Sequence, residues 1–458
     1  MIIKLVGAIN DLLWGDLIIL EFSGGEVQFG LSLLVLILIP AGLYFTFKTK
    51  FLPFRLFPEM IRVTLEKDEA KKDENSISGV QALIVATATR VGMGNLAGVV
   101  AAISFGGAGA VFWMWLTALI GSSSSFVEST LAQIYKEKDP LYGGYRGGPA
   151  YVMDRIRLVT KIKREDVFVK NVKEEAEYVA DDEQTYYTRG CKYGLLGTAF
   201  ALSGLLCLAG ISQVIGNSVT TSFQNAFGIP QVATATILVA MSAVIVLRKN
   251  ATVKVLDMVV PVMAGAYFLV TLFVIIKNIT LLPSVIGNIF SQAFGIRQFA
   301  GGGLGVIVMN GVKRGLFSNE AGSGSAPCAA AAAEVSHPVK QGLVQMLSVF
   351  IDTLLLCTAT AMMCMSSGID PAKELQGAPW VQASLQESLG SFGPVFITVA
   401  MVFFAFTTLL GNCFYCDNLL IYIHKKQPEK AFMKGFRLVS ALAIFLGAGM
   451  EMSLLWDL

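Results

Sequence analysis

Charge is scarce in this sequence. Of its 458 residues, 15% are charged and 54% are hydrophobic. A soluble domain carries about 25% charged residues, so this composition excludes an ordinary array of soluble domains and favours a chain embedded in a lipid bilayer. The net charge of +2 also argues against a nucleic-acid-binding protein, which needs a clustered basic surface. We therefore expect the bilayer as a partner and no nucleic acid.

Histidine is rare, and cysteine is not arranged for metal binding. The sequence has two histidines, His337 and His424, and seven cysteines, an odd number. Cys413 and Cys416 form a single C-x-x-C pair within an apolar stretch, without a second pair or a nearby histidine, so we interpret them as packing residues. With no Ser/Lys or Asp/Asp motif evident, an intramembrane enzyme is disfavoured, and we expect no enzymatic activity.

Long apolar stretches lie between the charge clusters. A helix needs about 20 apolar residues to cross the hydrocarbon core. The stretches of suitable length are 27–47, 78–104, 109–135, 193–226, 230–247, 253–276, 301–333, 342–365, 393–423 and 431–450. The sequence ends at Leu458 without a polar tail, which leads us to expect an eleventh helix that is missing from this chain.

Lysine and arginine predict the orientation of these helices, because they accumulate in cytoplasmic loops. With the N-terminus outside, 28 of the 35 basic residues fall in the predicted cytoplasmic loops. The largest loop, 136–192, is interpreted as a solvated insertion, with a regulatory or partner-binding element as the alternative. Segments 283–299 and 379–389 are expected along the outer surface. We expect a multi-pass protein of the plasma membrane.

The second apolar stretch should not be an ordinary helix. It contains Arg90, Gly92, Gly94 and Asn95 at the predicted mid-depth of the bilayer. An arginine facing lipid at that depth costs at least about 2.5 kcal/mol, so we expect Arg90 to face a polar interior. The glycines ease unwinding of the helix, which frees backbone groups for a ligand.

A second polar interruption lies at 311–327, in the seventh stretch. It combines Lys313, Arg314 and Glu320 with several glycines and Pro327. Close helix packing through small residues is the alternative reading of the glycines. Because the two interruptions are five helices apart, they predict inverted repeats whose discontinuous helices face each other.

The predicted fold is an all-α polytopic membrane protein with inverted five-helix repeats and two discontinuous helices. We expect one transmembrane domain over 1–458, with 27–47 as an extra first helix. The first repeat covers 78–276 and includes the insertion 136–192, and the second covers 301–458 without its last helix.

Polar side chains elsewhere in the apolar stretches are further candidates. Thr407 and Thr408 offer the oxygen ligands that sodium prefers, but hydroxyls in membrane helices commonly bond back to their own helix, and taken alone this second interpretation is favoured. Glu320 can pair with Arg90 or Arg314. The acidic residues that are candidates for coupling are Glu128, Asp257, Asp352 and Asp417, of which Asp257 and Asp417 are expected to be solvated near the cytoplasmic ends.

Four segments of the sequence resemble a known family, the sodium:alanine (alanine or glycine:cation) symporters. They are RVGMGNLAG at 90–98, GGAGAVFWMW at 106–115, GGPAY at 147–151 and GLFSNEAGSGSAP at 315–327. Ala108 stands where the family usually has proline, and we expect only a local loop change there. The resemblance implies an eleven-helix protein with the bacterial leucine-transporter fold in its last ten helices. It also implies import of alanine or glycine coupled to co-transported sodium by alternating access. We expect a functional monomer.

The resemblance also assigns roles to particular residues. It implies substrate binding near Gly92, Gly94, Asn95, Phe317 and Thr408, and a sodium site formed by Ala88, Val91, Thr407 and Thr408. Asn95 is expected near the substrate or a first sodium ion.

Two amides extend the predicted substrate pocket. Gln213 either binds the substrate ammonium group or ties helices together. Asn412 stands where many family members have tryptophan; if it lines the pocket, the pocket is larger and more polar. A sodium-coupled glutamine or serine symporter of the same fold is therefore the alternative function, and an ion channel is a less favoured one.

Overall fold

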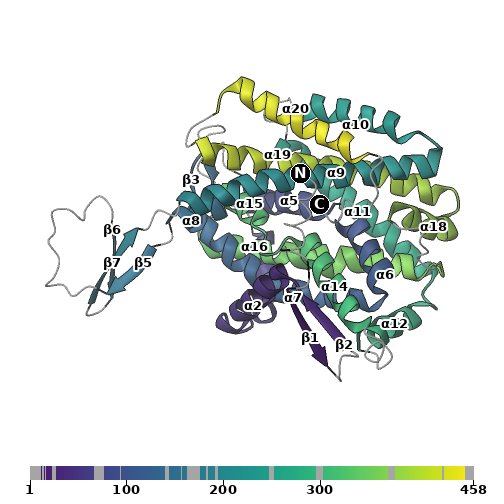
Figure 1. The fold of residues 1–458 in the computed structure, drawn as a ribbon, viewed down its shortest axis with the longest axis horizontal. Helices are drawn as coiled ribbons and strands as arrows, with labels where there is room; N and C mark the ends of the chain where they lie inside the picture. The colour runs from purple at the N-terminus through teal and green to yellow at the C-terminus, as the bar shows by residue number, and fades with distance from the viewer. Residues whose placement is uncertain are drawn as a thin grey trace.

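Helices make up most of the chain, as its apolar stretches predict (Figure 1). The computed structural model describes residues 12, 15, 17–22, 27–66, 77–92, 94–139, 144–155, 157–161, 176–181, 184–190, 194–246, 252–294, 303–369, 377–424 and 428–448.

Five helices in this described part are long and apolar enough to cross a bilayer. They are α7 (Gly109–Ile134), α9 (Gly194–Phe227), α11 (Thr252–Lys277), the continuous run of α16 (Pro338–Val349), η4 (Phe350–Cys357) and α17 (Thr358–Met365), and α19 (Phe392–His424). A bent helix pair adds a sixth span. The chain is thus a mostly helical, polytopic membrane protein, and these spans correspond to six of the ten predicted stretches.

The first of the predicted stretches was partly wrong. Its opening residues form β2 (Val27–Leu31), which pairs antiparallel with β1 (Ile18–Phe22). The helix α2 (Leu33–Lys48) begins only after Ser32, whose hydroxyl caps the backbone N–H of Val35. A short apolar run suits a strand and a helix equally well, so sequence pattern alone misplaced this boundary.

Both expected helix breaks are present. In the second stretch, α5 (Gly79–Arg90) is followed by the π-helix η2 (Gly94–Gly98) and α6 (Val99–Gly106), and the two halves meet at a bend of 49°. In the seventh, α14 (Gly303–Asn319) and α15 (Ser325–Ala332) are separated by five residues. This second break is shorter than the predicted interruption 311–327, because its N-terminal half, including Lys313 and Arg314, remains helical.

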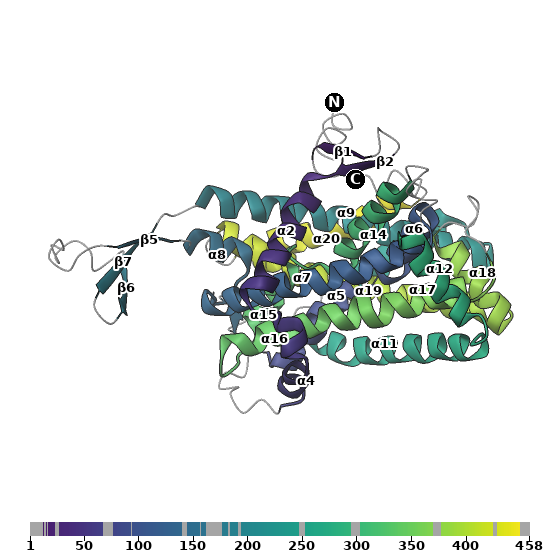
Figure 2. The same cartoon turned by 90° about the horizontal axis from the view of Figure 1, so that it is seen from below.

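The broken helices pack against α7, α16, η4 and α19. Large side chains from η2, α7, α11, α18 and α19 share one apolar core beside the first break, including Leu96, Met114, Tyr267, Trp380 and Phe404. Figure 2 shows α11 alongside α17, with which it is in contact. Both breaks therefore lie inside the helix bundle.

The predicted surface segments form helices. The segment near 283–299 contains α12 (Leu282–Phe294), which packs on α7, and the segment near 379–389 is α18 (Ala378–Leu389), which packs on α19. The remaining helices of the described residues are α3 (Leu52–Arg55), α4 (Phe57–Leu65), α8 (Pro149–Arg155), α10 (Gln231–Val246) and α20 (Lys430–Gly447).

The insertion after α7 contains all the other strands of the described part of the chain. A short hairpin of β3 (Glu137–Lys138) and β4 (Tyr145–Arg146) precedes α8 and packs on α15. Beyond α8, β5 (Arg157–Lys161), β6 (Ala176–Asp181) and β7 (Gln184–Gly190) form an antiparallel sheet in the order β5-β7-β6. Figures 1 and 2 show this sheet projecting away from the helices.

Candidate functional site

A buried carboxylate joins the two helix breaks. Asp352, fully buried in η4, accepts a hydrogen bond from Nδ2 of Asn95 at 2.8 Å through Oδ1. Its Oδ2 accepts hydrogen bonds from the hydroxyls of Ser318 at 3.1 Å and Thr353 at 2.8 Å. Asn95 belongs to η2 after the first break, and Ser318 lies two residues before the second, at the end of α14. Side chains from both discontinuous helices therefore donate hydrogen bonds to the same carboxylate.

The local backbone positions this cluster. Both η2 and η4 are π-helices, a wider winding that occurs frequently at functional sites. Oδ1 of Asn95 accepts a hydrogen bond from the N–H of Gly92 at 3.0 Å, which holds the unwound residues against the start of η2. A Cβ atom added to Gly94 would lie 2.9 Å from Cα of Ser318. Glycine at this position is thus what allows the two broken helices to approach each other.

A second set of oxygens lies on the other side of the first break. The hydroxyl of Thr408 lies 3.5 Å from the carbonyl oxygen of Ala88, near the end of α5. A Cβ atom added to Gly92 would collide with the same hydroxyl. Three of the predicted residues, Ala88, Gly92 and Thr408, are therefore in contact.

Thr407 points elsewhere. Its hydroxyl bonds back to the carbonyl oxygens of Phe403 and Phe404, both at 3.1 Å, and lies 4.0 Å from the sulfur of Met263 in α11. This is the back-bonded arrangement that is common for threonine in membrane helices. The structure brings Thr408 to Ala88 and does not bring Thr407 there.

Arg90 is almost fully buried, at 1% exposure, and faces the protein interior as predicted. Its guanidinium donates to the carbonyl oxygen of Gln345 at 3.2 Å and to the hydroxyls of Ser125 and Ser348. These bonds connect α5 to α7 and α16. Glu320 instead accepts hydrogen bonds from the hydroxyls of Thr89 and Ser325, and no salt bridge recorded within the described ranges joins it to Arg90.

The second break holds its own network. The N–H of Gly322 donates to a carboxylate oxygen of Glu128 in α7 at 3.2 Å, and the N–H of Ala321 donates to the side chain of Asn319 at 3.0 Å. Backbone groups released by the break are thus satisfied by neighbouring side chains, as burial requires. Glu128, a candidate for coupling, is placed at this break.

Other predicted residues lie around this centre. Val91 is fully buried and follows α5 as its C-cap residue, and the ring of Phe317 lies 3.8 Å from a Cβ built on Gly98. The backbone of Gln213 packs on Gly447 of α20. Asn412 lines a small cavity between α9, α10, α19 and α20, where its Nδ2 has no partner within the described ranges. Asn412 thus belongs to a cavity distinct from the Asp352 cluster.

One expectation for the acidic residues was wrong. Asp417 is not solvated but buried, at 3% exposure, and pairs with Arg437 of α20. The side chain of Asp257 lies outside the described residues. Ser318 and Thr353 were not predicted as site residues, because a hydroxyl in an apolar helix reveals nothing about which neighbour it faces.

Two broken helices around buried polar clusters define a secondary active transporter, the architecture in which substrate and ion sites form at discontinuous helices.

Comparison with known proteins identifies the family. A model of the sodium:alanine symporter family matches residues 12–162 and 167–458. The chain is similar to the probable sodium/glutamine symporter GlnT of Bacillus subtilis, with 39% identity over 456 residues that cover 99% of this chain and 84% of the relative. It is also 31% identical to the sodium/alanine symporter AgcS of Methanococcus maripaludis, over 100% of this chain and 90% of that protein. This chain belongs to the sodium:alanine symporter family.

A solved structure is similar in fold. A mutant of the manganese transporter of Eremococcus coleocola aligns with a TM-score of 0.51 and 12% sequence identity, over 83% of this chain and 71% of that one. At this identity the similarity concerns the fold alone. The family and its relatives confirm that the chain is a sodium-coupled amino-acid symporter and not an enzyme, with sodium as a co-transported substrate.

Proposed function

We propose that this chain imports small neutral amino acids, alanine and glycine, together with sodium by alternating access. The observation that carries the proposal is the cluster of Asp352, Asn95 and Ser318, because side chains from both broken helices donate hydrogen bonds to one buried carboxylate there. Sodium is a hard cation that takes oxygen ligands. The negative charge of a carboxylate offsets the free-energy cost of removing the sodium ion from water. A sodium ion held there would favour one arrangement of the two breaks.

The proposed sodium sites are two. The first uses the carboxylate of Asp352 and the hydroxyl of Ser318, with the amide nitrogen of Asn95 holding the carboxylate close to the predicted substrate position. The second uses the carbonyl oxygens of Ala88 and Val91 with the hydroxyl of Thr408, supported by the 3.5 Å separation between Ala88 and Thr408. Thr407, whose hydroxyl bonds back to its own helix, is left out of the second site.

The proposed substrate position lies between the sodium sites, at Gly92, Gly94 and Phe317. Released N–H groups at a helix break attract a carboxylate, and the close approaches of Gly92 to Thr408 and Gly94 to Ser318 leave no space there for a large substrate side chain. Gln213 remains a proposed partner of the ammonium group.

Glutamine is the second candidate substrate, because the relative from Bacillus subtilis is named a probable sodium/glutamine symporter. In the sequence, glutamine transport was supported by Asn412 as a pocket residue. In the structure, Asn412 lines a cavity apart from the Asp352 cluster, which weakens that support. A small substrate is therefore favoured.

We further propose inverted repeats, an outside N-terminus, the plasma membrane as location and a functional monomer.

Uptake of labelled alanine into proteoliposomes tests the proposal. An inward sodium gradient should drive accumulation, and replacement of sodium by choline should abolish it. Unlabelled glycine should compete more strongly than glutamine. Currents that do not saturate and need no amino acid would instead indicate a channel, and equal uptake in choline would overturn sodium coupling.

A further inference from the structure

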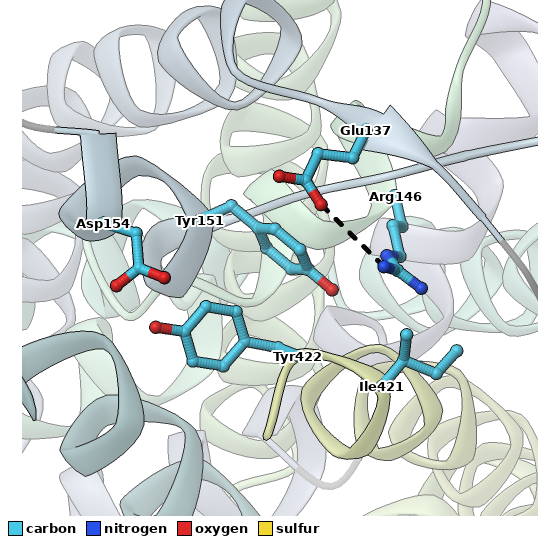
Figure 3. Close-up of a pocket in the computed structure, with 6 residues that line it drawn as sticks. All are labelled: Glu137, Arg146, Tyr151, Asp154, Ile421 and Tyr422. Atoms are coloured by element: carbon cyan, nitrogen blue, oxygen red, sulfur yellow. Dashed lines mark ion pairs between the residues drawn. The ribbon is translucent and has the colours of Figure 1, made fainter. Parts of the chain in front are cut away.

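A further cavity, lined by polar side chains, lies beside the β3–β4 hairpin near the C-terminal end of α19. It has a volume of about 80 Å³ and is lined by Glu137, Arg146, Tyr151, Asp154, Ile421 and Tyr422 (Figure 3). A single water needs about 10–15 Å³ of such volume, so the cavity has room for several waters or one small solute. In the predicted orientation this end of the helices faces the cytoplasm.

Arg146 lies in this cavity without a full set of partners. The residue is 9% exposed, and its Nε and Nη1 have no hydrogen-bond partner among the described residues. Its Nη2 lies 3.8 Å from a carboxylate oxygen of Glu137, which makes an ion pair but exceeds hydrogen-bond length. A buried donor left unsatisfied costs about 1–3 kcal/mol. Arg146 can therefore bind an acceptor that the described residues do not supply.

The other walls restrict what that acceptor can be. Glu137 and Asp154 add two carboxylates, so a simple anion would meet repulsion beside the guanidinium. The rings of Tyr151 and Tyr422 meet edge to face, with centroids 5.1 Å apart, and form an apolar wall with Ile421. Burial raises the pKa of Tyr151, whose neutral hydroxyl donates to the carbonyl oxygen of Asn418 at 3.2 Å. The cavity thus offers adjacent positive and negative groups next to a small apolar surface.

We propose that this cavity is a second binding site for a small zwitterionic amino acid, occupied as the substrate leaves the central site. The substrate carboxylate binds Arg146 and its ammonium group binds Glu137, so that the ligand inserts into the loose ion pair between them. Carboxylate and ammonium are held on one carbon in an α-amino acid, which matches the closeness of the two protein groups. The site rests on the proposed function for its place on the transport route.

The cavity is connected to the second helix break. Asn418, one turn before Tyr422 on α19, donates to the carbonyl oxygen of Gly147 at 2.6 Å. Gly147 and Gly148, which follow Arg146, pack against Ala331 and Cys328 of α15. Because α15 begins directly after the break, movement of this half-helix changes the position of Arg146. The site is thus arranged to respond when the central site opens.

Equilibrium binding of labelled alanine to the purified full chain tests the proposal. The cavity contains no proposed sodium ligand, so binding there should persist in choline, whereas binding at the central site should need sodium. In choline we expect one weak, saturable component. Arg146→Gln should weaken it at least tenfold, equivalent to about 1.4 kcal/mol, and Glu137→Gln should weaken it as well.

The sodium-dependent component serves as the folding control for each variant, and Arg437→Gln serves as the matched substitution. The side chain of Arg437 is 13% exposed, close to the 10% of Arg146, and pairs with Asp417 in another part of the molecule. Arg437→Gln should leave the binding in choline unchanged.

Three outcomes overturn the second site: no binding in choline, binding in choline that Arg146→Gln does not alter, or displacement of the bound alanine by chloride but not by glycine. If the wild-type chain showed no sodium-dependent binding of alanine, the proposed central sites would be refuted, whereas the second site would still be supported by binding in choline.

Discussion

The carboxylate of Asp352 lies 2.8 Å from the amide nitrogen of Asn95, so a residue of the eighth predicted span holds the broken second one. Both residues are fully buried. A buried charge requires several partners to offset its desolvation, and Ser318 and Thr353 supply further hydrogen bonds. This relationship links the two halves of the chain at the point where the proposed first sodium ion binds.

Asp352→Asn should raise the sodium concentration for half-maximal alanine uptake at least tenfold. Asparagine keeps the shape of aspartate and removes the negative charge, so the affinity for the sodium ion should decrease. The measurement is a sodium titration of uptake in proteoliposomes. Asp417→Asn is the matched control, since it removes a buried carboxylate from the pair with Arg437; it should lower thermal stability without altering the sodium titration. An unchanged titration for Asp352→Asn would exclude this residue as a ligand.

Adjacent threonines give a second, sharper test. Thr408→Val should raise the half-saturating sodium concentration about tenfold, because it removes the hydroxyl that faces the carbonyl oxygen of Ala88. Thr407→Val should have little effect, because that hydroxyl bonds back within α19. Valine matches threonine in shape, so both variants should fold. If the two variants behave alike, or if Thr407→Val has the larger effect, the second sodium site is assigned to the wrong residue.

Gly94→Ala should lower alanine uptake at least tenfold, with protein still inserted in the membrane. The added Cβ would lie 2.9 Å from Cα of Ser318, and backbone atoms on the facing helix cannot turn aside as a flexible side chain can. Gly265→Ala in α11 is the control, because a Cβ added there meets nothing within 4 Å. Uptake by Gly94→Ala at the level of the control would mean that close approach of the two broken helices is not needed for transport.

The helix breaks were predictable from sequence, and their partners were not. Arg90 and Glu320 each stand beside glycines in an apolar stretch, a combination that an unbroken lipid-facing helix cannot accommodate. Residues adjacent on a helix point about 100° apart, however, so the choice between Thr407 and Thr408 depends on how α19 packs on α5. The position of Asp352 beside Asn95 likewise depends on the packing of η4. Inverted repeats remain a prediction.

Lys136 provides a test of pH dependence outside the membrane-spanning helices. Its ammonium group donates to the carbonyl oxygen of Ala333 at 2.7 Å and to Gln133 at 2.9 Å. Burial lowers the pKa of Lys136 from 10.5 to about 8, and the nearby charge of Glu334 acts in the opposite direction. Because this pKa is lower in the folded chain, keeping the lysine charged opposes folding below about pH 8, and the penalty disappears as the pH rises toward 10.5.

The apparent unfolding temperature of Lys136→Met, relative to the wild type, should therefore fall between pH 7 and pH 9.5. Solvent screening at a half-buried lysine keeps the effect modest, and we expect a change of about 2 °C or more. Lys136→Arg supplies the control: neither arginine nor methionine titrates in this range, so the difference between these two variants should stay constant with pH. A wild type that loses stability relative to both variants as the pH rises would contradict the lowered pKa.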